Sequence, residues 1–346
     1  RLVTTITENS KVDLNVIDGT STARALTFST GGTVKIVIDP NGSIYNNSGT
    51  GQSFWGSNNA GNPSSVTGVS NSSFGYGAGN ALTTGYQNVN IGRDSGGALT
   101  TGLNNVSVGT NAGASNVDGQ QNTYVGTAAG YTSPGQNYNT FVGYESGHNN
   151  IANNNTALGR LSLHQNTSGT NNVALGHIAG DSVTTGSQNT FVGQAAGDEA
   201  TTGDYNICIG HGSGSGSSPF QLTTQSGRVV IGDNSITNSY IKVDWTVGSD
   251  KRDKINFSNV PHGLDFVNKL KPTSYDLRKE RDSDETIGTK KYGFIAQEIL
   301  ELEGDNSVII DNSDENKLGF QGSNLIPILV NAIQELKAEI ELLKSK

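Results

Sequence analysis

The sequence predicts a mainly β, trimeric protein: a β-solenoid, or β-roll, of 17-residue repeats, followed by an α+β region that ends in a three-stranded coiled coil. Three observations support this prediction. A glycine-centred motif recurs nine times between residues 71 and 214. The composition changes at residue 249, since residues 1–248 hold 40 of the 46 glycines but only 21 of the 53 charged residues. Apolar residues near the C-terminus follow a heptad.

Composition narrows the classes of function. The chain has 346 residues, a net charge of −9 and a pI near 5.0, which disfavours a nucleic-acid partner. It has no run of 18 apolar residues, so we expect no membrane span. The single cysteine, Cys208, excludes an intrachain disulfide framework and is expected to be a small buried residue. The absence of methionine suggests a fragment or a processed product.

Residues 1–56 form the predicted N-terminal β region. Strand-like alternation occurs at residues 14–17 and 33–38, and Asp39-Pro40-Asn41-Gly42 is a typical hairpin turn before a further strand at residues 43–45.

The predicted solenoid occupies residues 57–215, where Asn-x-x-apolar-Gly recurs at intervals of 17 residues, with one interval of 16. A second glycine follows four residues later in every copy but one, where Leu163 stands. Seventeen residues are too few for a helix pair but suffice for short strands and turns. The motif glycines are Gly75, Gly92, Gly109, Gly126, Gly143, Gly159, Gly176, Gly193 and Gly210.

Two stacked columns are expected inside each coil. The motif asparagines should form a ladder in which each side-chain amide bonds its neighbours on adjacent rungs. The apolar residues before the glycines should form an inner column: Phe74, Ile91, Val108, Val125, Val142, Leu158, Leu175, Val192 and Ile209. Such a coil buries little by itself. A second apolar column, at Tyr124, Phe141, Phe191 and Tyr205, would pack against other copies of the chain, which favours a homotrimer.

Residues 216–248 are predicted to form a β neck with strands near residues 228–232 and 240–247. The α+β region then spans residues 249–346. Its final stretch, 325–344, is the predicted coiled coil. Its seam steps by three and four residues through Ile326, Leu329, Ile333, Leu336, Ile340 and Leu343.

Two resemblances extend these predictions. The repeats of residues 71–214 resemble the head β-roll of trimeric bacterial adhesins, in which three chains lie side by side. Nearly all of residues 249–346 resembles the intramolecular chaperone, or peptidase S74, domain of phage tail fibres and tailspikes. The motifs that carry this second likeness are Ser-Asp-x-Arg-x-Lys at 249–254, Leu-Lys-Pro at 270–272, Gly-Phe-Ile-Ala-Gln-Glu at 293–298 and Leu-Val-Asn-Ala-Ile-Gln-Glu-Leu at 329–336.

The second resemblance implies a function and a site. The chaperone would bring three chains together, let the fibre fold in register, and then cut the chain between Ser249 and Asp250. Ser249 would be the nucleophile and Lys254 its base, since a neutral amine can take the serine proton. Ser249 Oγ would attack its own carbonyl or that of another chain. Asp253 stands where the family usually has an apolar residue. By pairing with Lys254 it would favour the charged amine and slow the cut.

The predicted role is therefore a trimeric virion tail fibre that attaches to a cell-surface receptor, with a glycan as the expected ligand and no cofactor or metal ion. Two alternatives remain open. A polysaccharide-degrading tailspike would need paired carboxylates, and only Asp198 and Glu199 are adjacent on the solenoid. A cellular trimeric adhesin, or a membrane-tethered regulator, could carry the same chaperone at a cell surface.

Overall fold

The structure, a computed structural model, describes residues 26–30, 33–38, 44–45, 54–55 and 67–346 apart from 280, 306 and 315. The chain divides into two compact units, Arg1–Asn139 and Thr140–Lys346. The expected strand at residues 14–17 and the expected turn at residues 39–42 lie outside the described residues.

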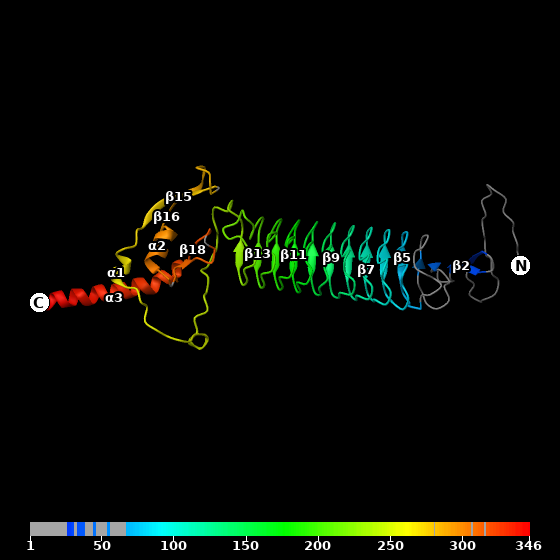
Figure 1. The fold of residues 1–346 in the computed structure, drawn as a ribbon, viewed down its shortest axis with the longest axis horizontal. Helices are drawn as coiled ribbons and strands as arrows, with labels where there is room; N and C mark the ends of the chain where they lie inside the picture. Colours follow the sequence, from blue (N-terminus) through cyan, green and yellow to red (C-terminus); the bar gives the residue numbers. More distant parts are fainter. Residues whose placement is uncertain are drawn as a thin grey trace. The chain divides into compact units, whose positions relative to one another are not determined.

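The first unit begins with an antiparallel sheet and continues as stacked rungs (Figure 1). β1 (Leu26–Thr30) pairs with β2 (Thr33–Ile38), which pairs with β3 (Ile44–Tyr45). Parallel strands of the solenoid follow, each pairing with the next: β4 (Phe54–Trp55), β5 (Ser72–Phe74), β6 (Val89–Ile91), β7 (Val106–Val108) and β8 (Thr123–Val125).

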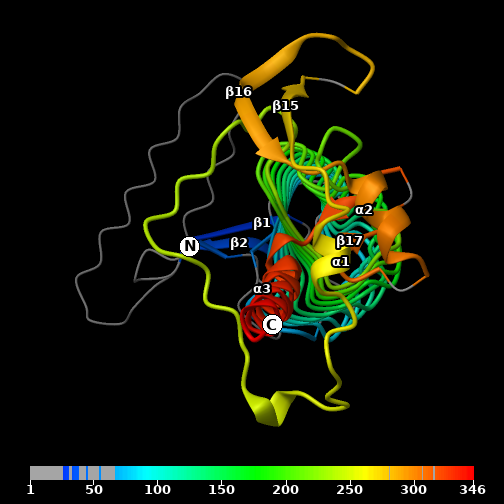
Figure 2. The same ribbon diagram turned by 90° about the vertical axis from the view of Figure 1, so that its left-hand side faces the viewer.

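The second unit opens with further rungs of the same kind, whose turns superimpose in the view of Figure 2. Its parallel strands pair in chain order: β9 (Thr140–Val142), β10 (Thr156–Leu158), β11 (Val173–Leu175), β12 (Thr190–Val192), β13 (Ile207–Ile209) and β14 (Val229–Ile231). The predicted β-solenoid is confirmed. β14 belongs to its sheet, whereas the strand expected at residues 240–247 is absent.

The inner column of the coil differs from the prediction. Each strand has three residues, and because side chains alternate between faces only the middle one points inward. The residue before the glycine therefore faces outward: Phe74 is 45% exposed and Leu158 is 52% exposed. The buried middle residues are Ser73, Asn90, Ser107, Tyr124, Phe141, Ala157, Ala174, Phe191, Cys208 and Val230. Of the predicted second column, Tyr124, Phe141 and Phe191 are thus core residues, while Tyr205 is exposed.

The glycine column exists because adjacent rungs approach closely. Gly176 has a φ of +144°, and a Cβ there would collide with the carbonyl oxygen of Gly193 on the next rung. The second glycine of each repeat, four residues after the first, also has a positive φ. Leu163 stands at this position in its repeat and adopts the same kind of backbone conformation, with a φ of 48°. Its rung carries the small Ala157 at the inward strand position, and the fully buried Leu163 side chain supplies apolar volume there. The missing glycine is thus explained by packing.

The α+β region follows the last rung. Its elements are η1 (Lys251–Asp253), α1 (Leu264–Val267), the antiparallel pair β15 (Thr273–Arg278) and β16 (Thr286–Gly293), α2 (Ala296–Glu303), the antiparallel pair β17 (Ile310–Asp311) and β18 (Gly319–Phe320), η2 (Gly322–Asn324) and α3 (Leu325–Lys344). Its core is formed by Phe266, Ile299, Ile309, Ile310, Leu325 and Ile328.

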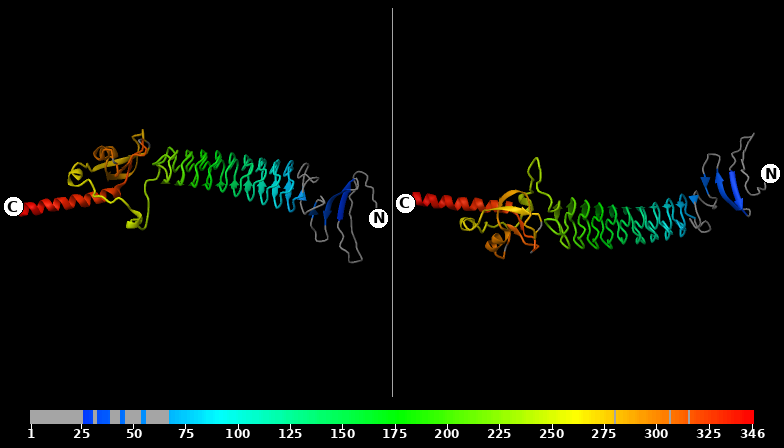
Figure 3. Two further views of the ribbon diagram at one scale, coloured as in Figure 1. Left: turned by 60° about the horizontal axis from the view of Figure 1, so that its bottom comes forward. Right: turned by 90° about the horizontal axis from the view of Figure 1, so that it is seen from above.

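Helix α3 has two apolar faces. Leu325, Ile328 and Ala332 are buried, which fixes its first turns to the core. The predicted heptad seam lies on another face and is exposed along its whole length, from Ile326 at 60% to Leu343 at 68%. The C-terminal part of α3 projects beyond the rest of the α+β region in both views of Figure 3. The helix is confirmed, and its seam has no partner within the described chain.

Candidate functional site: a serine–lysine pair at the junction

Residues 249–254 form one tight turn between the last rung and α1. The Asp250 carboxylate caps the turn η1 by accepting a hydrogen bond from the Arg252 backbone amide at 2.8 Å. It also accepts from the Arg252 guanidinium, with the Nη2 donor at 2.6 Å. Lys254 N closes the turn by donating to Lys251 O at 3.2 Å. The turn therefore holds the residues on either side of the predicted scissile bond in one local structure.

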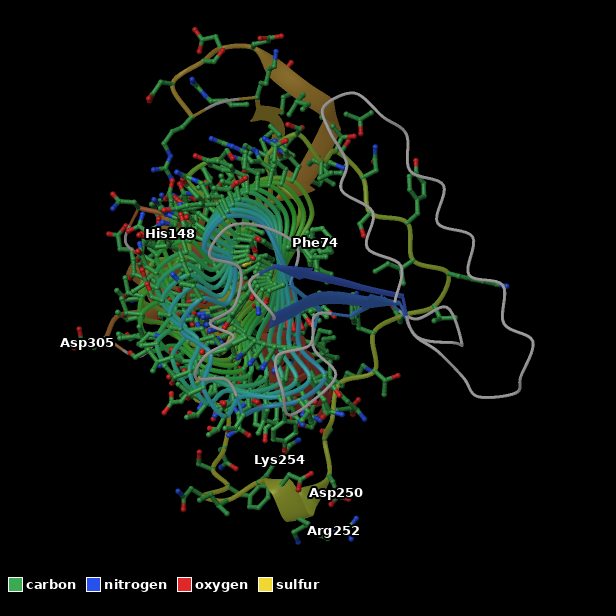
Figure 4. The ribbon with its side chains drawn as sticks, turned by 90° about the vertical axis from the view of Figure 1, so that its right-hand side faces the viewer. Phe74, His148, Asp250, Arg252, Lys254 and Asp305 are labelled. Atoms are coloured by element: carbon green, nitrogen blue, oxygen red, sulfur yellow. The ribbon has the colours of Figure 1, made fainter. Side chains whose placement is uncertain are left out.

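The turn brings Ser249 and Lys254 together. Lys254 Nζ donates a hydrogen bond to Ser249 Oγ at 2.5 Å, across five positions of sequence. The two atoms are thus within the distance that proton transfer requires, and a neutral amine at this position would accept the serine proton. Figure 4 shows Lys254, Asp250 and Arg252 close together on the segment that carries η1.

Charges within the turn are paired, but not as the sequence suggested. The hydrogen bond from the Arg252 side chain, followed by the one from its backbone, lowers the pKa of Asp250. The same side-chain bond raises the pKa of Arg252. The expected pairing of Asp253 with Lys254 is absent from the ion pairs of this turn, since the Lys254 amine is directed at the serine. The geometry therefore does not support the expectation that Asp253 slows cleavage by pairing with Lys254.

The site is open to solvent in the single chain. Ser249, Asp250 and Lys254 are all exposed. A lysine that serves as a base has to present a neutral amine, which burial favours. The pair therefore has the contact but not the environment for catalysis.

Helix α3 holds the chain just beyond this site. Asn331 Nδ2 donates to the backbone oxygen of His262 at 2.8 Å, and the Glu335 carboxylate accepts from the Leu264 amide at 2.6 Å. A side chain at Gly263 would collide with the Glu335 carboxylate. Sequence reasoning missed these contacts, and it also missed the pairing of Arg252 with Asp250. Only the short spacing of that second pair offered a signal.

Two of the sequence motifs meet in a pocket of the α+β region. Leu270 and Lys271 of one motif and Phe294, Ile295 and Glu298 of the other line this pocket, which has a volume of about 350 Å³. Lys271 Nζ lies 3.4 Å from a Glu298 carboxylate oxygen at its rim. Residues of the motifs at 270–272 and 293–298 thus contact each other, although the motifs are separate in sequence.

Titratable residues of the solenoid gather on rungs β9–β11. His164 lies 3.7 Å from carboxylate oxygens of both Glu145 and Asp181, and Arg160 Nη1 lies 2.9 Å from His177 Nε2. Among the residues that the structure describes, no group of three or more His, Cys, Asp or Glu side chains could hold a metal ion. Burial raises the pKa of the Cys208 thiol to about 12, in keeping with a core residue.

The fold and the junction define a class of protein: a β-solenoid followed by an α+β module with a serine–lysine turn at its start. Residues 249–308 match the family Peptidase_S74, described as "Chaperone of endosialidase". The chain therefore carries a domain of this family behind a β-solenoid, an arrangement typical of phage tail fibres and tailspikes. Comparisons with curated proteins and with solved structures found no match. No helix in the described ranges is long and apolar enough to cross a bilayer.

Proposed function

We propose that this chain is the trimeric fibre of a phage tail, or a similar surface fibre, that attaches to a host cell, and that its C-terminal domain assembles three copies and then cuts the chain between Ser249 and Asp250. The observation that carries the proposal is the 2.5 Å contact of Lys254 Nζ with Ser249 Oγ, at the start of the region that matches the S74 family.

The seam of α3 supports the trimer. Six apolar side chains at heptad positions are exposed on a helix whose other apolar face is already buried in its own domain. Water contact along such a seam is costly, at roughly 25 cal/mol per Å² of apolar surface. A parallel bundle of copies covers all six residues of the seam at once.

The outer face of the solenoid sheet supports the same assembly. Within the second unit, the outward positions carry exposed Leu158, Leu175, Ile207, Ile209 and Val229. The turns, by contrast, carry mostly asparagine, threonine, serine and glycine. A continuous apolar stripe on one face marks an interface. Packing of copies along this face leaves the polar turns outward, where three sets of weak glycan contacts would raise avidity.

The cleavage chemistry follows from the turn. A neutral Lys254 takes the proton of Ser249 Oγ, which attacks a Ser249 carbonyl carbon. Attack on its own carbonyl would close a strained ring of Oγ, Cβ, Cα and C, so we assign the attacked carbonyl to a neighbouring copy. The C–N bond to Asp250 breaks, Lys254 returns the proton to the departing amine, and water then hydrolyses the new ester. Burial in the assembled trimer would keep the amine neutral.

A denaturing gel tests the proposal. The purified 36.1 kDa chain should release a C-terminal piece of roughly 11 kDa, residues 250–346, while Ser249→Ala and Lys254→Ala stay intact. Lys251→Ala, a lysine of the same turn without contact to the serine, is the matched control and should be cut. Cleavage of the Ser249→Ala chain by itself would exclude the mechanism.

A further inference from the structure

Residues 240–247, just before the serine–lysine turn, have the pattern of a strand but not its structure. Apolar Ile241, Val243, Trp245 and Val247 alternate with polar or amphipathic residues, so that an extended chain would gather all four on one face. Yet the segment forms no strand, and residues 239–248 make no hydrogen bond with other residues that the structure describes.

The apolar face of this segment is uncovered. Val243, Trp245 and Val247 are 73%, 74% and 79% exposed, and Ile241 is 52% exposed. The residues after the turn continue the pattern, since Ile255 and Phe257 are 82% and 66% exposed. The serine–lysine pair therefore sits between two stretches whose apolar side chains are left exposed by the residues that the structure describes.

The size of the surface indicates what covers it. Four such side chains offer on the order of 300 Å² of apolar area per chain. A stable interface buries about 800 Å² per partner, so this surface is too small to hold a separate protein by itself. It is large enough as part of an interface that also includes the exposed seam of α3. In the proposed trimer that seam is covered by other copies of α3, and this argument favours a second copy of the same chain as the occupant of the segment.

We propose that residues 240–247 become a β-strand only on assembly, by pairing with the same segment of neighbouring copies, and that this pairing completes the cleavage site. The inference rests on the proposed function and names the part of the interface that controls it. Backbone pairing satisfies the free amides and carbonyls, and the alternation places the four apolar side chains between the copies. Val247 lies two residues before Ser249, so pairing up to this point fixes the scissile bond against the neighbouring turn and covers Lys254.

Fluorescence tests the pairing independently of cleavage. The chain has two tryptophans, so Trp55→Phe in the Ser249→Ala background leaves Trp245 as the only reporter. In the trimer, Trp245 should emit at shorter wavelength than in urea and should be protected from iodide. An iodide sensitivity in the trimer equal to that in urea would overturn the proposal, as would a chain that stays monomeric at every concentration.

Cleavage tests the alternation. Val247→Lys should slow cleavage about tenfold or more while light scattering still reports a trimer held by α3. Thr246→Lys, one residue away on the opposite face, should be cut at the wild-type rate. Equal rates for the two variants would overturn the proposal. If wild type itself is never cut, the proposed cleavage function fails, and the Trp245 measurement still decides whether the strand forms.

Discussion

The side-chain oxygen of Asn172 accepts two hydrogen bonds from Asn189 on the next rung, one from its backbone amide at 3.0 Å and one from its side-chain amide at 3.1 Å. Asn172 Nδ2 in turn donates to the Gly186 carbonyl at 2.8 Å. Both residues are buried. The ladder therefore satisfies polar groups that water cannot reach, and each rung depends on the previous one.

Loss of one asparagine should destabilise the solenoid. Asn172→Ala leaves the Asn189 donors and the Gly186 carbonyl buried without their partner, at a cost of about 2–3 kcal/mol. The expected result is a lower midpoint of urea unfolding, followed by circular dichroism. Gln194→Ala, at an exposed position of a neighbouring rung, should leave the midpoint unchanged. Equal midpoints for the two variants would contradict the role of the ladder.

Stability should depend on pH through Asp198. Burial, and then the Glu199 charge, raise the pKa of Asp198. A folded-state pKa above the unfolded value means that the charged carboxylate destabilises the fold at neutral pH, and that this penalty disappears as the pH falls toward about 3.9. Asp198→Asn should raise the thermal midpoint at pH 7, by an amount worth less than about 1 kcal/mol, and not near pH 4. The exposed Asp118→Asn should show no such difference.

The seam of α3 should control assembly. In the proposed trimer, Leu336→Asp places a charge where three helices meet, so we expect a monomer by light scattering at micromolar concentration. Because Leu336 lies outside the buried cluster of the α+β region, its circular dichroism should stay close to wild type. Lys337→Asp, off the seam and one residue away, should remain trimeric. A trimeric Leu336→Asp would exclude the coiled coil as the assembly element.

Mixed trimers should reveal which chain is cut. A Ser249→Ala chain lacks the nucleophile but keeps a bond before Asp250, so a wild-type neighbour can attack it. Co-expression of the two chains with different tags should therefore release a C-terminal piece from the Ser249→Ala chain. Adding Lys254→Ala to the wild-type partner should abolish that release. A Ser249→Ala chain that stays whole beside an actively cleaving partner would show that attack occurs within one chain.

The repeat, its asparagine ladder and the helix at residues 325–344 could be predicted from the sequence because each depends on regular spacing. The direction of the strand side chains could not. In a three-residue strand, Phe141 and Val142 are both apolar, and only the backbone phase decides that Phe141 is inside. Leu163 can likewise replace a glycine of the repeat because Ala157, six residues earlier, leaves room for its side chain. No sequence motif links these two positions.

At the junction, the sequence was sufficient to pair Ser249 with Lys254 but not to place their neighbours. The contact of Arg252 with Asp250 follows from a turn whose shape is set by one capping carboxylate. The contacts of Asn331 and Glu335 with residues 262–264 join segments about seventy residues apart, which only the packing of α1 on α3 brings together. The absent strand at residues 240–247 shows the same limit, because a β pattern does not say whether its own chain offers a partner strand.

The glycine at each rung contact has an evolutionary consequence. Because Gly176 meets Gly193 backbone to backbone, this contact between rungs does not depend on the side chains that differ from one repeat to the next. Unequal recombination within the gene can then add or remove a 17-residue unit and still present compatible surfaces on both sides. The length of the solenoid can then change in steps of one coil, while the S74 domain that begins at residue 249 stays the same.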